Sequence, residues 1–582
     1  MTDGTSASMP AAKRLPVVRG GSDQVTILAV VIGVILLVLV VPPAGILIWR
    51  SLVVTNPDAS LGGVTLEHYT RFLTNPALLR SLTNSLVFAV VSTMVALLFG
   101  GTLAWLVERT NTRLKALAYV TTIISMGTPY ILYVSAWLFL LGRSGPLNDG
   151  WRTLTGTRQA LFDPYSLIGM ILIEGFLWSP LVFLLLSSTF RSANADMEEA
   201  ARMSGAGVFR TVWSISLKMA TPAILALALF VFIRAIEAFE VPALVGMPGG
   251  VYVLTTDVYR SIRESIPPDL GYASAYSVVL LVVVAILLHF YGRLSRHAGR
   301  YSTVTGKGYR PRQFDLGKYR RLGDGLILFN FCIVLLLPLV ALLWISLLPY
   351  MQAIRWKAVP SFSLQNYLVV LESSYYRELA VNTLIVGVVA ATGVIILTFF
   401  TGWLSARRKF GGRVLDQLAT IPLVFPGVVM GVAFLMIFLY LPFPIYGTLW
   451  ALAIAYIVRY TPYGLRYTYA GVLQIHAELE EAAGASGATP LQSLRRIIAP
   501  LLSPALLSGW LFVFLIATKE LAVAALLSGP QSPVVAVGMF DLWTNGQGNE
   551  LAAFGLIWAA IMTAVASVFY FLAREGERTR GH

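Results

Sequence analysis

Residues 25–49 read VTILAVVIGVILLVLVVPPAGILIW, an apolar run of 25 residues without a charged side chain. At 1.5 Å per residue, a helix of this length crosses the roughly 30 Å hydrocarbon core of a bilayer. Buried helices of a soluble protein would give apolar runs of only about 10–14 residues. The stretch therefore predicts a membrane-spanning helix near the start of the chain.

The composition of the whole chain supports the same class. Its 582 residues are 57% hydrophobic and 12% charged, with a mean hydropathy of +0.74, which excludes a soluble protein of this size. We expect an all-α integral membrane protein with about twelve transmembrane helices in two homologous six-helix halves. The predicted spans lie near 25–49, 84–106, 117–141, 166–189, 221–240 and 273–291, then 326–348, 381–405, 416–440, 447–469, 503–527 and 551–573.

The net charge of +14 does not indicate nucleic-acid binding, because Lys and Arg gather in short segments between the apolar runs. Counting spans alternately places these basic segments and both termini on the cytoplasmic side. The single cysteine, Cys332, excludes an intramolecular disulfide and a cysteine metal site. The expected organisation is a cytoplasmic tail at 1–24, membrane domains at 25–291 and 326–573, a basic cytoplasmic linker at 292–325 and a cytoplasmic tail at 574–582.

Residues of the first half recur in the second at two fixed offsets. Five recur 298 positions later: Leu66, Tyr69, Asn84, Trp105 and Arg109 as Leu364, Tyr367, Asn382, Trp403 and Arg407. Seven recur 282 positions later: Pro180, Glu199, Gly205, Ile215, Pro222, Phe230 and Phe232 as Pro462, Glu481, Gly487, Ile497, Pro504, Phe512 and Phe514. The 16-residue difference falls in the loop between the third and fourth spans, which is longer in the first half. The pattern predicts a duplication, with parallel halves related by an axis along the membrane normal.

A short polar pattern follows the fourth predicted span of each half. It reads MEEAARMSGA at 197–206 and LEEAAGASGA at 479–488. Glu-Ala-Ala favours a helix, and the glycine six positions after the glutamate can adopt the left-handed conformation that ends it. We expect the amphipathic segment that follows each turn to pack beneath the spans. Its apolar residues are Val208, Phe209, Val212, Trp213 and Ile215 in one copy and Leu491, Leu494, Ile497 and Ile498 in the other.

This pattern resembles the Glu-Ala-Ala loop of permease subunits from binding-protein-dependent ATP-binding-cassette importers, which have the MetI-like permease fold. The family pattern is Glu-Ala-Ala, three residues, Gly, nine residues, then Ile-x-Leu-Pro. The second copy matches it except that Ala499 replaces the leucine; its matching residues are Glu481, Gly487, Ile497 and Pro500. The first copy has Lys218 at the proline position, so we expect its exit from the second segment to differ; it matches at Glu199, Gly205, Ile215 and Leu217.

The resemblance implies that each loop docks on a separate ATPase and carries its motion to the spans. The implied coupling residues are Glu199, Ala200, Ala201 and Gly205 in the first copy and Glu481, Ala482, Ala483 and Gly487 in the second. It also implies two copies of an ATPase subunit, a periplasmic or lipid-anchored solute-binding protein and a prokaryotic inner membrane. The chain contains no Gly-x-x-x-x-Gly-Lys-[Ser/Thr] phosphate loop, so ATP and Mg²⁺ are assigned to the partner ATPase. We expect no catalytic residue, bound cofactor or metal ion in this chain.

Charged residues inside spans are energetically costly and often mark a transport pathway. The candidates are Glu174, Arg234, Glu237, Glu240, Lys519 and Glu520. They would line or gate a pathway for a polar solute, or they would form mutual salt bridges that hold the helices together, such as Arg234 with Glu237 one turn away. Both interpretations stay open. Pro129, Pro180, Pro426 and Pro462 also lie in predicted spans, where proline can kink a helix.

Two strings resemble those of fused, twelve-span ferric-iron permeases: IEAFEVPALVG at 236–246 and Lys519-Glu520-Leu521. Ferric ion is a hard cation, which carboxylate oxygens suit. Permeases for 2-aminoethylphosphonate, polyamines, thiamine and sulfate are similar, so these substrates stay open. A secondary transporter is the alternative class, because twelve spans in two halves are common there. Such a transporter would not need Glu-Ala-Ala loops.

Overall fold

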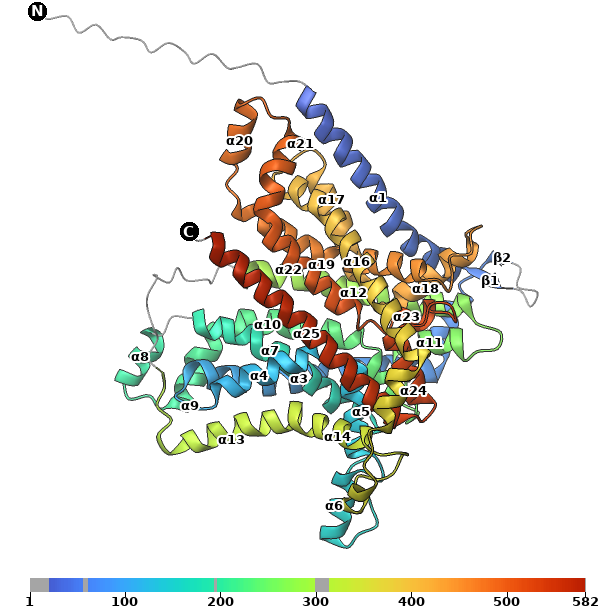
Figure 1. Cartoon of the computed structure of the whole chain (residues 1–582), viewed down its shortest axis with the longest axis vertical. Coiled ribbons are helices and arrows are strands. Elements are labelled where there is room, and N and C mark those ends of the chain that lie inside the picture. The colour runs from blue at the N-terminus through green and yellow to red at the C-terminus, as the bar shows by residue number, and fades with distance from the viewer. Residues whose placement is uncertain (1–19, 56–60, 193–195, 299–312, 581–582) are drawn as a thin grey trace, which may run out of the picture.

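The structure is a computed structural model that describes residues 20–55, 61–192, 196–298 and 313–580, and it is almost entirely helical (Figure 1). Residues 1–19 of the predicted N-terminal tail, 299–312 of the linker and 581–582 of the C-terminal tail lie outside the described residues. In the described part, the strands form one antiparallel hairpin of β1 (Val53–Thr55) and β2 (Leu61–Val64).

The first half runs from α1 to α12. Its helices are α1 (Gly20–Ser51), α2 (Glu67–Thr74), α3 (Pro76–Arg109), α4 (Lys115–Gly127), α5 (Tyr130–Leu141), α6 (Pro146–Thr155), α7 (Leu167–Ser192), α8 (Asp196–Met203), α9 (Val208–Thr211), α10 (Leu217–Ile236), α11 (Leu254–Arg263) and α12 (Leu270–Ala298). Two π-helical turns, Val212–Ser216 and Pro242–Gly246, precede and follow α10.

The second half repeats this order from α13 to α25. Its helices are α13 (Arg320–Phe331), α14 (Leu337–Ser346), α15 (Gln365–Glu372), α16 (Ser374–Ala406), α17 (Gly412–Thr420), α18 (Gly427–Tyr440), α19 (Leu449–Gln474), α20 (Glu478–Ala485), α21 (Pro490–Ser493), α22 (Ala499–Ala517), α23 (Ala524–Leu527), α24 (Val535–Thr544) and α25 (Gly548–Arg580). Shorter turns are π-helical at Cys332–Leu336 and Leu494–Ile498 and 3₁₀ at Gly317–Tyr319, Trp356–Ser361 and Ile421–Val424. The bounds of α19 equal those of α7 displaced by 282 positions, whereas α6 has no counterpart.

Fewer helices meet the criteria for a membrane span than the twelve expected. Within the described residues, nine helices are long and apolar enough, and two bent pairs raise the number to eleven. The one remaining expected span, 447–469, corresponds to α19. This helix contains Arg459 and Arg466, and it is not among those candidates. It packs against α16 and α22, as α7 packs against α3 and α10.

The third span of each half, which the sequence predicted as one helix with a possible proline kink, is sharply bent. The chain bends by 109° between Lys115–Gly127 and Tyr130–Thr155, and by 104° between Gly412–Val424 and Gly427–Tyr440. Each break comes directly before a proline, Pro129 or Pro426. Proline disfavours helical backbone in the residue before it, and Thr128 and Phe425 are indeed extended. The predicted spans 117–141 and 416–440 are therefore wrong as single helices.

The fifth span of each half ends earlier than predicted. Helix α10 stops at Ile236 rather than near residue 240, and α22 stops at Ala517 rather than near residue 527. Both ends are closed by backbone bonds, from Glu237 N to Ile233 O and from Thr518 N to Phe514 O. Glu237, Lys519 and Glu520 therefore lie in non-helical backbone just beyond these spans. Arg234 lies in the last turn of α10, and Glu240 begins the next short helical segment.

The first span of each half packs both on the last helix of its own half, α12 or α25, and on the opposite half. Helix α1 contacts α16, α17 and α18, while α13 contacts α4 and α14 contacts α5. Figure 1 shows α1 along one side of the second half and α13 along the outer side of the first. The two halves are therefore interlocked through their first spans.

Candidate functional site

The two Glu-Ala-Ala loops have the same local structure. The first comprises α8, α9 and the turn Val212–Ser216, and the second comprises α20, α21 and the turn Leu494–Ile498. Figure 1 shows both loops at the left and upper left, the side on which α25 ends and α1 begins. Both loops thus project from one side of the molecule.

The predicted glycines end the first short helix of each loop. Gly205 has a φ of +81° and Gly487 a φ of +86°, in the left-handed region that favours glycine. The amide of Ala206 donates to Ala201 O at 3.0 Å, and that of Ala488 donates to Ala483 O at 3.0 Å. This six-to-one bond is the Schellman closure of a helix. The second alanine of each Glu-Ala-Ala thus supplies the carbonyl that the turn caps.

A buried ion pair fixes each loop to the second span of its half. Arg109 Nε lies 3.7 Å from Glu198 Oε2, and both residues are about 97% buried. Ser216 Oγ also donates to Glu198 Oε1 at 2.6 Å. This pair links the end of α3 to α8 and to the turn before α10.

The second loop has the equivalent anchor. Arg407 Nε donates to Glu480 Oε1 at 2.6 Å, and Trp403 Nε1 donates to Glu480 Oε2 at 3.2 Å. Arg407 also donates to Ile475 O at 2.8 Å. The sequence repeat includes both arginines, but the glutamates that hold them directly precede the glutamates of the motif and were not predicted.

The motif residues themselves are more accessible than these anchors. Glu481 and Ala482 are exposed, as are Ala200 and both glycines, whereas Ala201 and Ala483 are half-buried. Glu199 is also half-buried. Each loop therefore presents its turn and part of its Glu-Ala-Ala face outward.

Two expectations about the segments after the turns are wrong. Trp213 is 70% exposed instead of packed beneath the spans, although Leu494 and Ile498 are buried as predicted. The side chain of Phe209 lies outside the described part. The exits also do not differ, since both π-turns continue directly into α10 or α22.

The structure brings together the four predicted intramembrane charges of the first half. Arg234 Nη1 donates to Glu237 Oε2 at 2.8 Å, and its guanidinium lies 5.5 Å from the centre of the Trp178 ring. Trp178 Nε1 in turn donates to Glu174 Oε1 at 2.9 Å. Glu240 lies close enough to Glu174 for the two charges to interact. The four acidic and basic residues form one cluster at the ends of α7 and α10.

A second cluster contains Glu520. Arg459 Nε donates to Glu520 Oε2 at 3.0 Å, and Tyr460 Oη donates to the same carboxylate. The amide of Val523 donates to Glu520 Oε1 at 3.1 Å. Arg459 and Glu520 also act electrostatically on Glu237, so the clusters of the two halves are neighbours. Sequence reasoning missed Arg459, although an arginine inside predicted span 447–469 was itself a signal.

Lys519 is separate from these clusters. Its Nζ donates to the carbonyl of Met126 at 2.6 Å, in the last turn of α4 at the break of the third span. At the equivalent break, Arg459 Nη1 donates to Phe425 O at 3.3 Å. Cations of the second half therefore bind a backbone carbonyl at each broken span, and the Lys519 bond joins the two halves.

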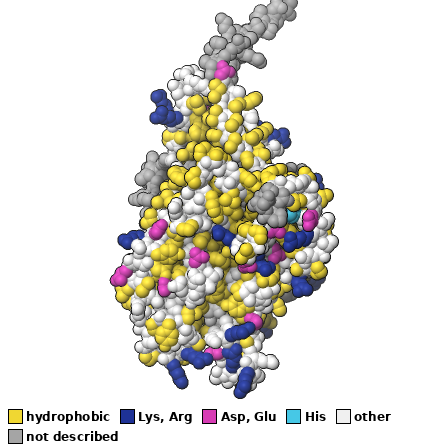
Figure 2. All heavy atoms as spheres, turned by 90° about the vertical axis from the view of Figure 1, so that its right-hand side faces the viewer, with side chains coloured by type: hydrophobic (Ala, Val, Ile, Leu, Met, Phe, Trp, Pro, Cys, Tyr) yellow, Lys and Arg dark blue, Asp and Glu magenta, His cyan; other side chains and the backbone are white. Residues whose placement is uncertain are grey.

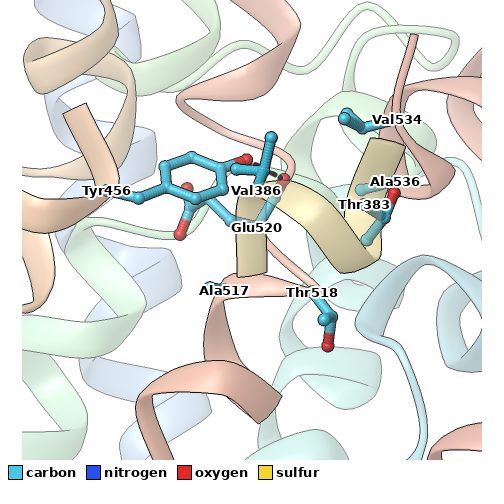
Figure 3. Close-up of a pocket in the computed structure, with 8 residues that line it drawn as sticks. All are labelled: Thr383, Val386, Tyr456, Ala517, Thr518, Glu520, Val534 and Ala536. Carbon is cyan, nitrogen blue, oxygen red and sulfur yellow. Dashed lines mark hydrogen bonds between the residues drawn. The ribbon is translucent and has the colours of Figure 1, made fainter. Parts of the chain in front are cut away.

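The space beside Glu520 is closed. Figure 3 shows Tyr456 and Glu520 pointing toward each other, and Tyr456 Oη donates to Glu520 O at 3.2 Å. Thr383, Thr518 and Val534 surround them in a pocket that leaves no room for a solute. Among the described residues, no group of three His, Cys, Asp or Glu side chains could hold a metal ion.

A larger cleft of about 330 Å³ lies between the ends of α15 and α24 and the starts of α16 and α25. Tyr376 Oη donates to the Glu550 carboxylate there, and Asp541 lies on the same cleft. Burial raises the pKa of Asp541, and the positive charge of Arg263 opposes that rise. The cleft is thus a carboxylate-lined opening in the second half.

Residues 96–300 and 395–575 match the family described as the inner membrane component of binding-protein-dependent transport systems. The two matches together cover more than half of the chain, so the protein belongs to this family. It is the membrane permease of an ATP-binding-cassette importer and not the subunit that hydrolyses ATP. One match falls in each half, which confirms the predicted duplication; the domain boundaries stay a prediction.

Named relatives differ in how much of the chain they cover. A ferric transport system permease protein of Actinobacillus pleuropneumoniae is 26% identical over 518 residues, which are 88% of this chain and 73% of that protein. A spermidine/putrescine permease of Haemophilus influenzae is 25% identical over 242 residues, 41% of this chain and 92% of that protein. A putrescine permease of Escherichia coli is 27% identical over 207 residues, 34% of this chain and 73% of that protein.

Proposed function

We propose that the chain is the permease of a ferric-iron importer driven by separate ATPase subunits. Ferric iron is supported as the substrate by the share of this chain that each relative covers. The ferric relative aligns over 88% of this chain, whereas the spermidine/putrescine relative aligns over 41%. A fused permease with two halves is thus shared with a protein named for ferric transport. The buried carboxylates are compatible with this substrate, because ferric ion prefers oxygen ligands.

We assign the contact with the ATPases to the Glu-Ala-Ala loops. The proposed contact residues are Glu199, Ala200, Ala201 and Gly205 in one loop and Glu481, Ala482, Ala483 and Gly487 in the other. The outward-facing turns and the buried ion pairs to the second spans support this role. A loop must be rigidly attached to the transmembrane helices if its movement is to move them. Two loops on one side imply two ATPase subunits. Because ATP is cytoplasmic, this side and both termini would face the cytoplasm.

We assign the translocation pathway to the neighbouring charge clusters. The proposed residues are Glu174, Arg234, Glu237, Glu240, Lys519 and Glu520, and we add Arg459 because it pairs with Glu520. Their position between the halves supports a gate that opens when the halves move apart. The ion pairs Arg234–Glu237 and Arg459–Glu520 are equally compatible with a structural role, so variants must separate the two.

Reconstituted uptake tests the substrate. The chain, its ATPase and its solute-binding protein are placed in proteoliposomes, and ATP-dependent uptake of radioactive ferric iron is compared with that of putrescine and 2-aminoethylphosphonate. We expect iron uptake at least ten times above the level without ATP, and no ATP-dependent uptake of the other two. Uptake of putrescine instead of iron would contradict the assignment of ferric iron as the substrate, but not the assignment as an importer.

A matched control tests the mechanism against the secondary-transporter alternative. Glu199→Ala and Glu481→Ala are combined in one chain and compared with Glu378→Ala, a change outside both loops. We expect the loop variant to lose ATPase association and uptake, with Glu378→Ala unaffected. If no ATPase associates with the native chain and the loop variant still transports, the importer assignment fails.

A further inference from the structure

Helix α6 is the helix of the first half that has no counterpart among the described residues of the second half. The equivalent connection, 441–448 between α18 and α19, is a short segment without a charged residue. Helix α7 ends beside α8 and is 26 residues long, so its start lies roughly 39 Å from the Glu-Ala-Ala loop. Because α6 directly precedes that start, it lies at the outer end of the molecule, away from both loops (Figure 1).

A buried asparagine holds α6 in place. Asn148 is fully buried, and its Nδ2 donates to Leu141 O at 2.7 Å, to Gly142 O at 3.1 Å and to Phe162 O at 2.9 Å. Its Oδ1 accepts from the amide of Phe162 at 3.1 Å. Both ends of the insertion are therefore fixed to one side chain. The result is a rigid projection, not a loose loop.

The second half completes this projection. Arg355 donates to Asp149 Oδ2 through Nη2 at 2.7 Å and through Nε at 3.0 Å, and Arg152 pairs with Asp149 Oδ1 at 3.0 Å. We call residues 142–166 and 349–363 together the α6 surface. It is thus built from both halves, which are linked by the ion pair of Asp149 with Arg355.

The α6 surface is basic. It carries five cations, Arg143, Arg152, Arg158, Arg355 and Lys357, against two acids, Asp149 and Asp163, a net charge of +3. In the described part of the chain, Arg143, Arg158 and Lys357 are exposed and in no ion pair. Figure 2 shows Lys and Arg gathered at the lower end of the molecule, where Figure 1 places α6. These charges are available to an acidic partner.

Large apolar side chains lie exposed among these charges. Leu147, Trp151 and Leu154 follow one face of α6, and Leu154 is 86% exposed. Trp356, next to Arg355, is 83% exposed. Exposed tryptophan with arginine is typical of protein interfaces, in which these two residues provide much of the binding energy. A preformed surface also loses little entropy on binding.

We propose that the α6 surface docks an acidic face of the solute-binding protein and, because it occurs once, fixes that protein's orientation. The two halves are related by pseudo-twofold symmetry, so a symmetric outer face would accept the binding protein in two orientations. A charged projection on one half favours only one of them. This inference rests on the proposed function, since it needs a binding protein as partner.

Charge reversal tests the inference. The chain and its ATPase are placed in nanodiscs and titrated with the binding protein of the same transport system. We expect Arg143→Glu combined with Arg158→Glu to weaken binding about tenfold and to reduce the salt dependence, with ATP hydrolysis in the absence of binding protein unchanged. The control is Arg80→Glu, an exposed arginine near the start of α3 outside the surface, which should change the affinity less than twofold.

The outcomes separate the inference from the proposed function and from lipid binding. If the binding protein stimulates ATP hydrolysis by the native complex but the double variant binds as tightly, the inference alone is overturned. If no stimulation occurs with the native complex, the proposed function is overturned as well. If the affinity falls only in nanodiscs with anionic lipid, the surface binds the membrane and the inference is overturned.

Crosslinking tests the orientation separately. A photoreactive residue replaces Leu154, whose side chain points outward. We expect crosslinks to one lobe of the binding protein only. Crosslinks to both lobes in similar yield would show two orientations and overturn this part of the inference.

Discussion

Each Glu-Ala-Ala loop carries two adjacent glutamates with different surroundings. Glu480 is paired with Arg407 and bonded by Trp403, whereas Glu481 is exposed. In the second loop Glu480 thus ties the loop to the second span, and Glu481 faces outward. The family pattern begins at the second glutamate, so it omits the residue that fixes the loop to its own half.

Removing this anchor should affect both folding and transport. Arg407→Ala leaves Glu480 without its cation, and breaking a buried ion pair typically costs about 3 kcal/mol. We expect a lower thermal unfolding temperature and loss of uptake, measured on the reconstituted transporter. Arg413→Ala, an exposed arginine on the same side with no ion pair in the described residues, serves as the control. Equal unfolding temperatures and equal uptake for the two variants would contradict the proposed role of Arg407 as an anchor.

Glu240 separates the two interpretations of the intramembrane charges. In the described part of the chain it is in no ion pair, unlike Glu520. If these carboxylates meet the substrate, Glu240→Gln should reduce iron uptake about tenfold without changing thermal stability. Glu520→Gln should lower both, because it leaves Arg459 unpaired. Native uptake by Glu240→Gln would favour the purely structural interpretation.

The sequence identified the charged residues and the local pair Arg234–Glu237, but not the partner of Glu520. The cost of burying a charge singled out Glu174, Glu237 and Glu520 without any knowledge of the fold. Glu520, however, pairs with Arg459, which is 61 positions away on another helix. Such long-range pairing depends on tertiary packing, which local periodicity does not contain.

At the scale of elements, the broken third spans combine a predictable and an unpredictable feature. Pro129 and Pro426 were predicted as possible kinks, and the breaks occur directly before them. The size of the bends, 109° and 104°, could not be predicted. It depends on neighbouring groups that satisfy the freed carbonyls, among them Lys519 at Met126 and Arg459 at Phe425.

Lys519 should restrain the two halves. Its bond to Met126 O joins α4 of the first half to the end of α22 in the second. In Lys519→Met this bond is lost, so separation of the halves becomes easier. We expect ATP hydrolysis without binding protein to rise at least twofold in the reconstituted complex. An unchanged basal rate would show that the contact does not oppose the movement.

The two loops offer a test of asymmetry. Alanine at Gly205 or Gly487 would be strained by about 1 kcal/mol, because both have positive φ, and neither has a neighbour within 4 Å of the added methyl group. The local cost is therefore the same, and any difference in uptake reports the ATPase contacts. We expect unequal losses, since the first loop also exposes Met203 and Trp213. Equal losses would contradict the predicted inequality of the two ATPase contacts, but they would not contradict the duplication.

At the scale of the whole molecule, the exchange of first spans was not predictable. The sequence repeat predicted two halves in the correct order, because identical residues at fixed offsets can be recognised from the sequence alone. The apolar run 25–49 indicates a span but carries no information about its neighbours. In the structure α1 packs on the second half and α14 on the first. The halves therefore cannot separate as independent bodies without moving their first spans.

The central claim is that one chain presents two docking sites for ATPase subunits. Native mass spectrometry of the complex purified from its own membrane tests this most directly. The account predicts one copy of this 63.5 kDa chain with two copies of an ATPase subunit. A complex with one ATPase subunit, or a chain that carries none under conditions that support transport, would contradict it.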